Sequence, residues 1–266
     1  SFENGSQLTL TGTNGNNIDF ISDHGSNTFD LTMNGSYDLT YVDGIRSDAS
    51  SGRTIYAHTG STKTSCVNWF VAGDSGATVT WDGSASSDWN AAANWDVNRT
   101  PMELDNVVVA NAGTAPYIPA GTYKYVSLTV NTGATATCAG STALVNTASG
   151  GTAADPHGEG VTFTVTSANI VGTVSANGQG FATASGPGKG SNRSNVGSGG
   201  GYGGRGGDEG YYTGSRAGGS IYGSPTQPTA LGSGGGYTGG GAGGGAIKLS
   251  ASGTVTVAGT VSADGA

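Results

Sequence analysis

The abundance of glycine restricts the possible folds of this chain more than any other feature of its sequence. It occupies 51 of 266 positions, and its densest run lies between Gly178 and Gly245. Glycine loses more backbone freedom on folding than any other residue, and it weakens the interior of helices. The remaining sequence is rich in Thr, Ser, Ala, Val and Asn, and poor in the Leu, Glu and Lys that favour helices. We therefore expect an all-β protein made of short strands and tight turns.

Short apolar–polar alternations fill the first 75 residues. Gln7-Leu8-Thr9-Leu10, Ile18-Asp19-Phe20-Ile21 and Tyr37-Asp38-Leu39-Thr40-Tyr41-Val42 are examples, each bounded by Gly, Asn, Asp or Ser. Such runs indicate strands that end in turns. Their close spacing is compatible with an antiparallel meander or with successive faces of a parallel solenoid, and the pattern does not separate the two.

Two stretches resemble bacterial secreted and cell-surface proteins. Ser36 to Phe70, with the closing Asn68-Trp69, resembles the repeated tails of secreted β-helix modules. Thr80-Trp81-Asp82-Gly83 and the later run Val126-Ser127-Leu128-Thr129-Val130 resemble the opening of autotransporter-type, adhesin-like repeats. The resemblance implies a right-handed parallel β-solenoid (β-helix) at the cell surface, and it carries no catalytic residue with it.

The clearest internal repeat pairs Gly172-Thr173-Val174-Ser175-Ala176-Asn177-Gly178 with Gly259-Thr260-Val261-Ser262-Ala263-Asp264-Gly265. Both copies follow strand-like runs. We expect them to be two coils of one solenoid, with the residues between them looping out and returning to the same stack. Because the second copy ends one residue before the last position, we also expect the natural chain to continue.

Three of the four tryptophans, Trp81, Trp89 and Trp95, fall within a short span. In the resembling repeats such a cluster caps the solenoid. Large aromatic side chains are mostly buried, which favours packing in a core or cap. Aromatic rings near turns can also stack on sugars, so these three residues are the candidates for carbohydrate binding.

The glycine-rich stretch has the composition of a flexible linker. If it is ordered, side chains cannot hold it, and we expect extended, polyproline II-like segments joined by backbone contacts. This composition resembles the polyglycine bundles of phage tail-tip adhesins and of certain antifreeze proteins. Five tyrosines interrupt the glycines and are candidates either for packing within the chain or for a contact between subunits: Tyr202, Tyr211, Tyr212, Tyr222 and Tyr237.

Cys66 and Cys138 are the only cysteines. Two thiols without a histidine cluster make a poor zinc site. We predict a disulfide between them, because the rest of the sequence resembles secreted proteins; two free buried thiols are the alternative.

Charge and motifs argue against several functions. Only 11% of residues are charged and the formal net charge is −8, so we expect no nucleic-acid partner. No apolar run is long enough for membrane insertion. The histidines are isolated, and we predict no metal, cofactor or catalytic residue. Polysaccharide-cleaving β-helices bring several carboxylates together on one face. The candidates here are Asp19, Asp30, Asp38, Asp43, Glu103 and Asp105. We favour the alternative, in which these carboxylates form an exposed, solvated face.

We therefore predict four segments: solenoid over 1–75, a second solenoid segment with a tryptophan-rich opening over 76–177, a glycine-rich insert over 178–245, and a returning coil over 246–266. The predicted function is that of a non-enzymatic structural subunit of an extracellular filament or cell-surface adhesin, with itself as the main partner and surface glycans as a further one. The alternative is a carbohydrate-binding or polysaccharide-cleaving β-helix.

Overall fold

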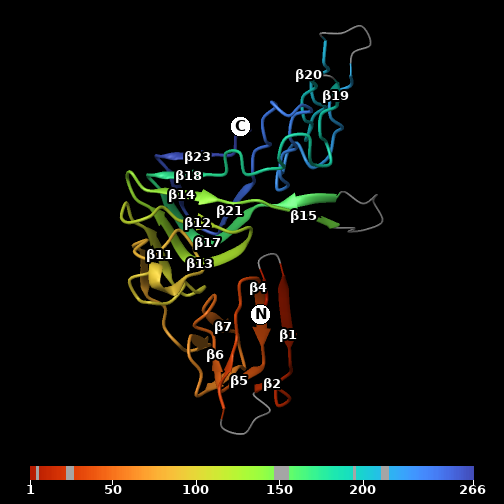
Figure 1. Ribbon diagram of the computed structural model, residues 1–266. Coiled ribbons are helices and arrows are strands. Elements are labelled where there is room, and N and C mark those ends of the chain that lie inside the picture. The colour runs from red at the N-terminus through yellow and green to blue at the C-terminus, as the bar shows by residue number, and fades with distance from the viewer. Residues whose placement is uncertain (4–5, 22–26, 147–155, 194–195, 211–215) are drawn as a thin grey trace. The chain divides into compact units, whose positions relative to one another are not determined.

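Strands dominate the computed structural model, which describes residues 1–3, 6–21, 27–146, 156–193, 196–210 and 216–266 (Figure 1). The fold is all-β with mostly parallel sheets, and the described residues include one short 3-10 turn at Ala92–Asn94 but no α-helix. The chain divides into two compact units. Unit 1 comprises Ser1–Ala136, Phe163–Thr173 and Ser250–Gly259, and unit 2 comprises Thr137–Thr162, Val174–Leu249 and Thr260–Ala266. Unit 1 thus contains both sides of the predicted boundary at residue 75.

Nine short strands form the first part of unit 1. Their bounds are β1 Gln7–Thr11, β2 Ile18–Ile21, β3 Phe29–Asp30, β4 Ser36–Thr40, β5 Val42–Ile45, β6 Ser47–Asp48, β7 Ile55–Ala57, β8 Thr62–Thr64 and β9 Trp69–Val71. These strands form four small sheets, and every pair in them is parallel. The sheets are β1-β4, β2-β5-β8, β3-β6 and β7-β9. The antiparallel meander, one of the two alternatives, is therefore wrong for this part.

Single residues in the left-handed conformation form the corners between these strands. Tyr41 separates β4 from β5 with a φ of 52°, and Arg46 separates β5 from β6 with a φ of 56°. A non-glycine residue seldom adopts a positive φ, and it turns the chain sharply when it does. Three consecutive strands can therefore join three different sheets without an intervening loop.

The alternation seen in the sequence produces the core of this part. Met33, Leu39, Val42, Ile55 and Trp69 are each no more than 2% exposed and pack in one cluster. Neighbouring polar positions along the same strands point outwards, as the period of two requires. Burial of these apolar side chains is the main favourable contribution to folding here.

A larger sheet has the strand order β10-β11-β13-β17-β21, with β22 also pairing with β17. The bounds are β10 Thr78–Trp81, β11 Asn106–Val109, β13 Gly121–Val130, β17 Val161–Ile170, β21 Ile247–Ala251 and β22 Val255–Val257. A second sheet has the order β12-β14-β18-β23, formed by Tyr117–Ile118, Thr135–Cys138, Thr173–Ser175 and Thr260–Ser262. Two small antiparallel pairs complete the strands: β15 Ser141–Asn146 with β16 Pro156–Glu159, and β19 Asn192–Arg193 with β20 Val196–Gly197.

The two copies of the internal repeat lie next to each other, as predicted. A Cβ atom on Gly259 would lie 1.9 Å from the carbonyl oxygen of Gly172. Further along, the Gly178 amide donates to the carbonyl of Asp264 at 2.8 Å. The Asp264 amide in turn donates to the side-chain oxygen of Asn177, which lies 87 positions earlier. The same spacing separates Gly172 from Gly259, and β18 and β23 are neighbours in one sheet, so the two copies lie side by side in matching register. The closed solenoid itself stays a prediction.

Candidate functional site

The glycine-rich segment, Gly178–Gly245, lies within unit 2 and is held by its own backbone. Its described residues between β20 and β21 form no strand. Hydrogen bonds nevertheless join parts that are far apart in sequence: Gly180 N–H to Gly243 O at 2.8 Å, Phe181 N–H to Gly232 O at 2.9 Å, Gly236 N–H to Ser198 O at 2.9 Å, and Gly219 N–H to Gly199 O at 2.9 Å. This agrees with the predicted packing through backbone contacts, whereas the polyproline II conformation itself stays a prediction.

Close approach of backbones explains why glycine is needed at particular positions. A Cβ atom on Gly234 would lie 2.2 Å from the carbonyl oxygen of Ala182, and one on Gly236 would lie 2.0 Å from that of Ser191. Real side chains do not tolerate such distances to backbone atoms. One small buried apolar cluster combines Phe181 and Leu231 of this segment with Ala246, the residue that follows it.

Two of the five candidate tyrosines pack inside the segment. The rings of Tyr202 and Tyr222 meet edge to face at 5.2 Å, and Tyr222 is 8% exposed. The Tyr222 hydroxyl donates to the carbonyl of Leu231, and the Ala230 amide donates to the Tyr202 hydroxyl at 3.2 Å. For Tyr222 the structure therefore corrects the subunit-contact hypothesis in favour of packing within the chain. Tyr237 is half-buried, and Tyr211 and Tyr212 lie outside the described residues.

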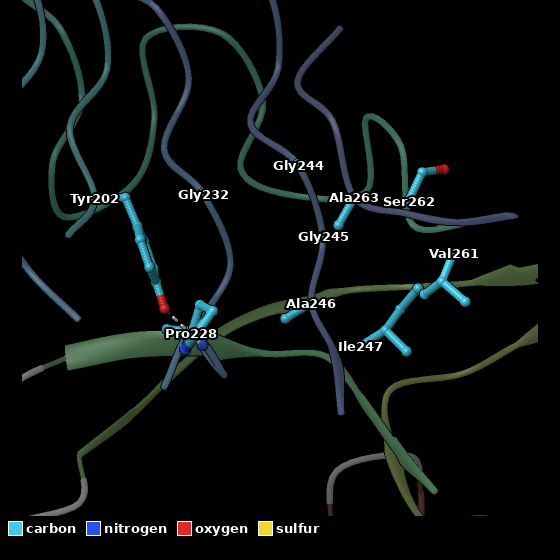
Figure 2. A pocket seen from close by; sticks show the side chains of 11 residues that line it. Tyr202, Pro228, Gly232, Gly244, Gly245, Ala246, Ile247, Val261, Ser262 and Ala263 are labelled. Atoms are coloured by element: carbon cyan, nitrogen blue, oxygen red, sulfur yellow. Dashed lines mark hydrogen bonds between the residues drawn. The ribbon is translucent and has the colours of Figure 1, made fainter. Parts of the chain in front are cut away.

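A pocket of about 420 Å³ opens beside this segment, within unit 2 (Figure 2). Figure 2 shows Tyr202 and Pro228 on one side and Ile247 and Val261 on the other, with the backbone of Gly244–Gly245 between them. No lining residue carries a charge, and the side-chain polar groups are the hydroxyls of Tyr202 and Ser262. Without an ionisable acid or base near neutral pH, the lining suits binding rather than acid–base catalysis.

The tryptophan cluster is buried in unit 1. Trp81, Trp89 and Trp95 are each no more than 1% exposed, and the Trp89 and Trp95 rings meet at 4.6 Å with an interplanar angle of 79°. Each indole N–H has an internal acceptor: Thr114 O at 2.8 Å, the Tyr125 hydroxyl at 3.2 Å and Trp89 O at 3.1 Å respectively. These rings are not available to stack on a sugar, so the core interpretation holds and the sugar-stacking hypothesis for them is wrong in this structure.

The predicted disulfide is not present. Cys66 and Cys138 are both free thiols. Cys138 is fully buried, and desolvation raises the pKa of its thiol to about 12. Cys66 is half-buried in unit 1, where its sulfur lies 3.5 Å from the carbonyl of Thr64. Sequence similarity to secreted proteins suggested the disulfide, but pairing depends on tertiary geometry, which spacing in sequence does not reveal.

One charged cluster unites residues that the sequence left separate. His58 lies between two carboxylates, with its Nδ1 3.3 Å from Glu103 Oε1 and its Nε2 3.7 Å from Asp38 Oδ1. Partial burial raises the pKa of Glu103, while the positive charges of His58 and Lys124 act in the opposite direction. The histidine follows β7 and Asp38 is in β4, so the parallel return of the chain brings them together. Asp38 and Glu103 are among the carboxylates that the sequence singles out, but no spacing in the sequence predicts the histidine between them.

The other candidate carboxylates do not join this cluster. Asp19 and Asp30 are exposed. Asp43 accepts hydrogen bonds from Asn17 and Thr62, both at 2.7 Å, and these bonds lower its pKa. Asp105 is fully buried and makes a two-pronged ion pair with Arg99, at 2.6 and 2.8 Å. Some of the candidate carboxylates are therefore exposed to solvent, and others hold the fold together through hydrogen bonds or an ion pair.

Within the described ranges, no group of three or more His, Cys, Asp or Glu residues is arranged to hold a metal ion. A helix long and apolar enough to cross a membrane is likewise not found among those residues. Comparisons with known proteins give no match to a family model, to a curated protein or to a solved structure.

Proposed function

We propose that this protein is a structural β-solenoid subunit of an extracellular filament or cell-surface adhesin, that it is not an enzyme, and that it acts through self-association and surface contacts. The observation that carries the proposal is the in-register stacking of the repeat copies, in which Gly259 lies against Gly172 and Asp264 bonds to Asn177. A sequence unit that stacks on its own copy within one chain has the surface needed to stack on a copy in another chain.

Three further features support a solenoid with a structural role. Strands β1 to β9 return in parallel without helices, and one-residue corners connect β4, β5 and β6. The glycine-rich segment is held by backbone hydrogen bonds, and it offers few side chains that could take part in catalysis. Low charge and many small polar residues favour close lateral packing. The proposed place outside the cell follows from the resemblance to secreted and cell-surface repeats.

Surface glycans remain a proposed partner, although the buried tryptophans no longer support them. The pocket beside Tyr202 is a part of unit 2 where a small apolar or sugar-like group would fit. Binding of an array of soluble glycans, compared between the protein and its Tyr202→Ala variant, separates this contact from self-association.

Self-association is tested by electron microscopy and sedimentation velocity of the purified chain over a concentration series. We expect fibres or discrete oligomers whose proportion rises with concentration, because edge pairing follows mass action. Dispersed monomers at every concentration up to roughly 100 μM, where weak contacts are populated, would contradict the proposal.

A further inference from the structure

Two apolar rows run across the larger sheet within unit 1. One row contains Val79, Val107, Leu128, Ala168 and Val255, and the other contains Trp81, Val109, Val130, Ile170 and Val257. The step from β13 to β17 follows from hydrogen bonds: the amides of Val171 and Gly172 donate to Val130 O, just as those of Ala258 and Gly259 donate to Ile170 O, so Val130 lies beside Ile170. In both rows every member on β10, β11, β13 and β17 is no more than 4% exposed. The last members, Val255 and Val257 on β22, are 44% and 50% exposed. The interior of the sheet therefore lacks cover at β22.

The backbone of β22 is also open on one side. Among the described residues β22 pairs with β17 alone. The Ala168 amide donates to the carbonyl of Thr254 at 3.0 Å, and the Ala258 amide donates to that of Ile170 at 2.9 Å. Thr254 and Ala258 thus face β17. Since backbone groups alternate along a strand, Val255 and Val257 direct their N–H and C=O groups to the free edge.

This edge carries none of the usual protection against strand pairing. Exposed edges are ordinarily blunted by charged residues, proline or bulges. The stretch from Ser252 to Ala258 contains no charged residue and no proline. An uncharged edge with half-exposed valines is suited to pairing with another strand.

We propose that β22 is a self-association edge at which the β22 strand of a second copy pairs antiparallel, about a two-fold axis through Thr256. The inference rests on the proposed function and names the surface that carries it. The occupant is a second copy because the strand is symmetric about Thr256, with a valine on each side. Two-fold pairing places Val255 opposite Val257 of the second copy, and Thr256 opposite Thr256.

The hydrogen-bonding pattern suits this register. An antiparallel ladder alternates between pairs that exchange two hydrogen bonds and pairs that exchange none. With the axis at Thr256, the two valine pairs exchange bonds, and these are the residues whose backbone groups face the free edge. The threonine pair, whose backbone groups face β17, exchanges none. All four valines lie on the buried side of the joined sheet, and no like charges meet.

The test compares sedimentation velocity of the unaltered chain with that of Val257→Lys. A lysine at the edge would have to be buried against the second copy, so we expect the association constant to fall by at least about tenfold. Val126→Lys is the matched control, because Val126 is 38% exposed but lies on β13, an inner strand of the sheet. Its association should equal that of the unaltered chain.

Hydrogen exchange of the unaltered chain gives an independent readout that does not depend on a variant folding. On association, the amides of Val255 and Val257 should gain protection, and that of Thr256 should already be protected in the monomer. Association without added protection at these valines, or equal association of Val257→Lys, would overturn the β22 edge while leaving self-association intact. A chain that never associates contradicts the proposed function itself.

Discussion

At the scale of single residues, His58 occupies the position with the clearest chemical character. A neutral imidazole donates from one ring nitrogen only, whereas both nitrogens of His58 face carboxylates, those of Asp38 and Glu103. Protonation of His58 would give each carboxylate an N–H donor. The cluster therefore links strand β4, the end of β7 and the segment before β11 through charge.

Removing the histidine tests this link. In His58→Asn we expect the pKa of Glu103, already raised by burial, to rise further, because the opposing positive charge is lost. The measurement is an NMR titration of the Glu103 carboxyl carbon. Lys63→Gln, which removes a cation paired with Asp74 instead, should leave that titration unchanged. A Glu103 titration unaffected by His58→Asn would show that the two groups do not interact.

The direction of the pH effect on stability follows from the same shift. A carboxyl whose pKa is raised on folding contributes stability that is complete below its unfolded value, near 4.5, and that is lost as the pH rises through the folded value. In Glu103→Gln this loss disappears, so the unfolding free energy at about pH 7 minus that at about pH 4 should be larger than in the unaltered chain.

At the scale of elements, the glycine-rich segment depends on backbone contacts where other proteins use side chains. Hydrogen bonds between distant glycines, such as Gly180 to Gly243, hold the segment together. Ordering glycine is costly in entropy, so the packing must be close and regular. Substitutions that separate the backbones are expected to loosen the whole segment.

Alanine substitutions test whether glycine is needed for close backbone contact at particular positions of this segment. Gly236→Ala should lower the free energy of unfolding by about 1–3 kcal/mol, the usual cost of overpacking, because its methyl group would meet the carbonyl of Ser191. Gly204→Ala is the control, since no heavy atom lies within 4 Å of its would-be Cβ. It should be neutral or stabilising by up to about 1 kcal/mol. Thermal or denaturant unfolding measures both, and equal losses would argue against close packing.

At the scale of the whole molecule, the absence of a cross-link leaves noncovalent packing to hold each unit. Both thiols are free, and Cys138 is buried with a pKa raised to about 12 by desolvation. A buried thiol of this kind is inert, whereas a partly exposed one reacts.

Thiol labelling of the native protein checks this organisation. We expect a maleimide to modify Cys66 readily and Cys138 only after unfolding, and a reducing agent to leave the melting temperature unchanged. Mass spectrometry of digested protein assigns the modified residue. A melting temperature that falls on reduction, together with no labelling of either cysteine, would restore the disulfide.

Local structure could be predicted from the order of the residues. Alternating runs such as Gln7–Thr11 form strands, because the pattern of apolar and polar residues acts over short distances. The matching turns at Gly172 and Gly259 are neighbours, because two copies of one sequence adopt the same geometry. Glycine content indicated a flexible linker, and it predicted packing by backbone only for the case that the segment is ordered.

Which distant groups meet depends on how the strands pack, and this could not be predicted from the sequence. The burial of Trp81, Trp89 and Trp95, the free cysteines and the Asp38–His58–Glu103 cluster all depend on the register in which one strand is laid against another. Shifting a strand by one residue exchanges its inner and outer faces, and no spacing in the sequence records that register. The open valine row on β22 has the same origin.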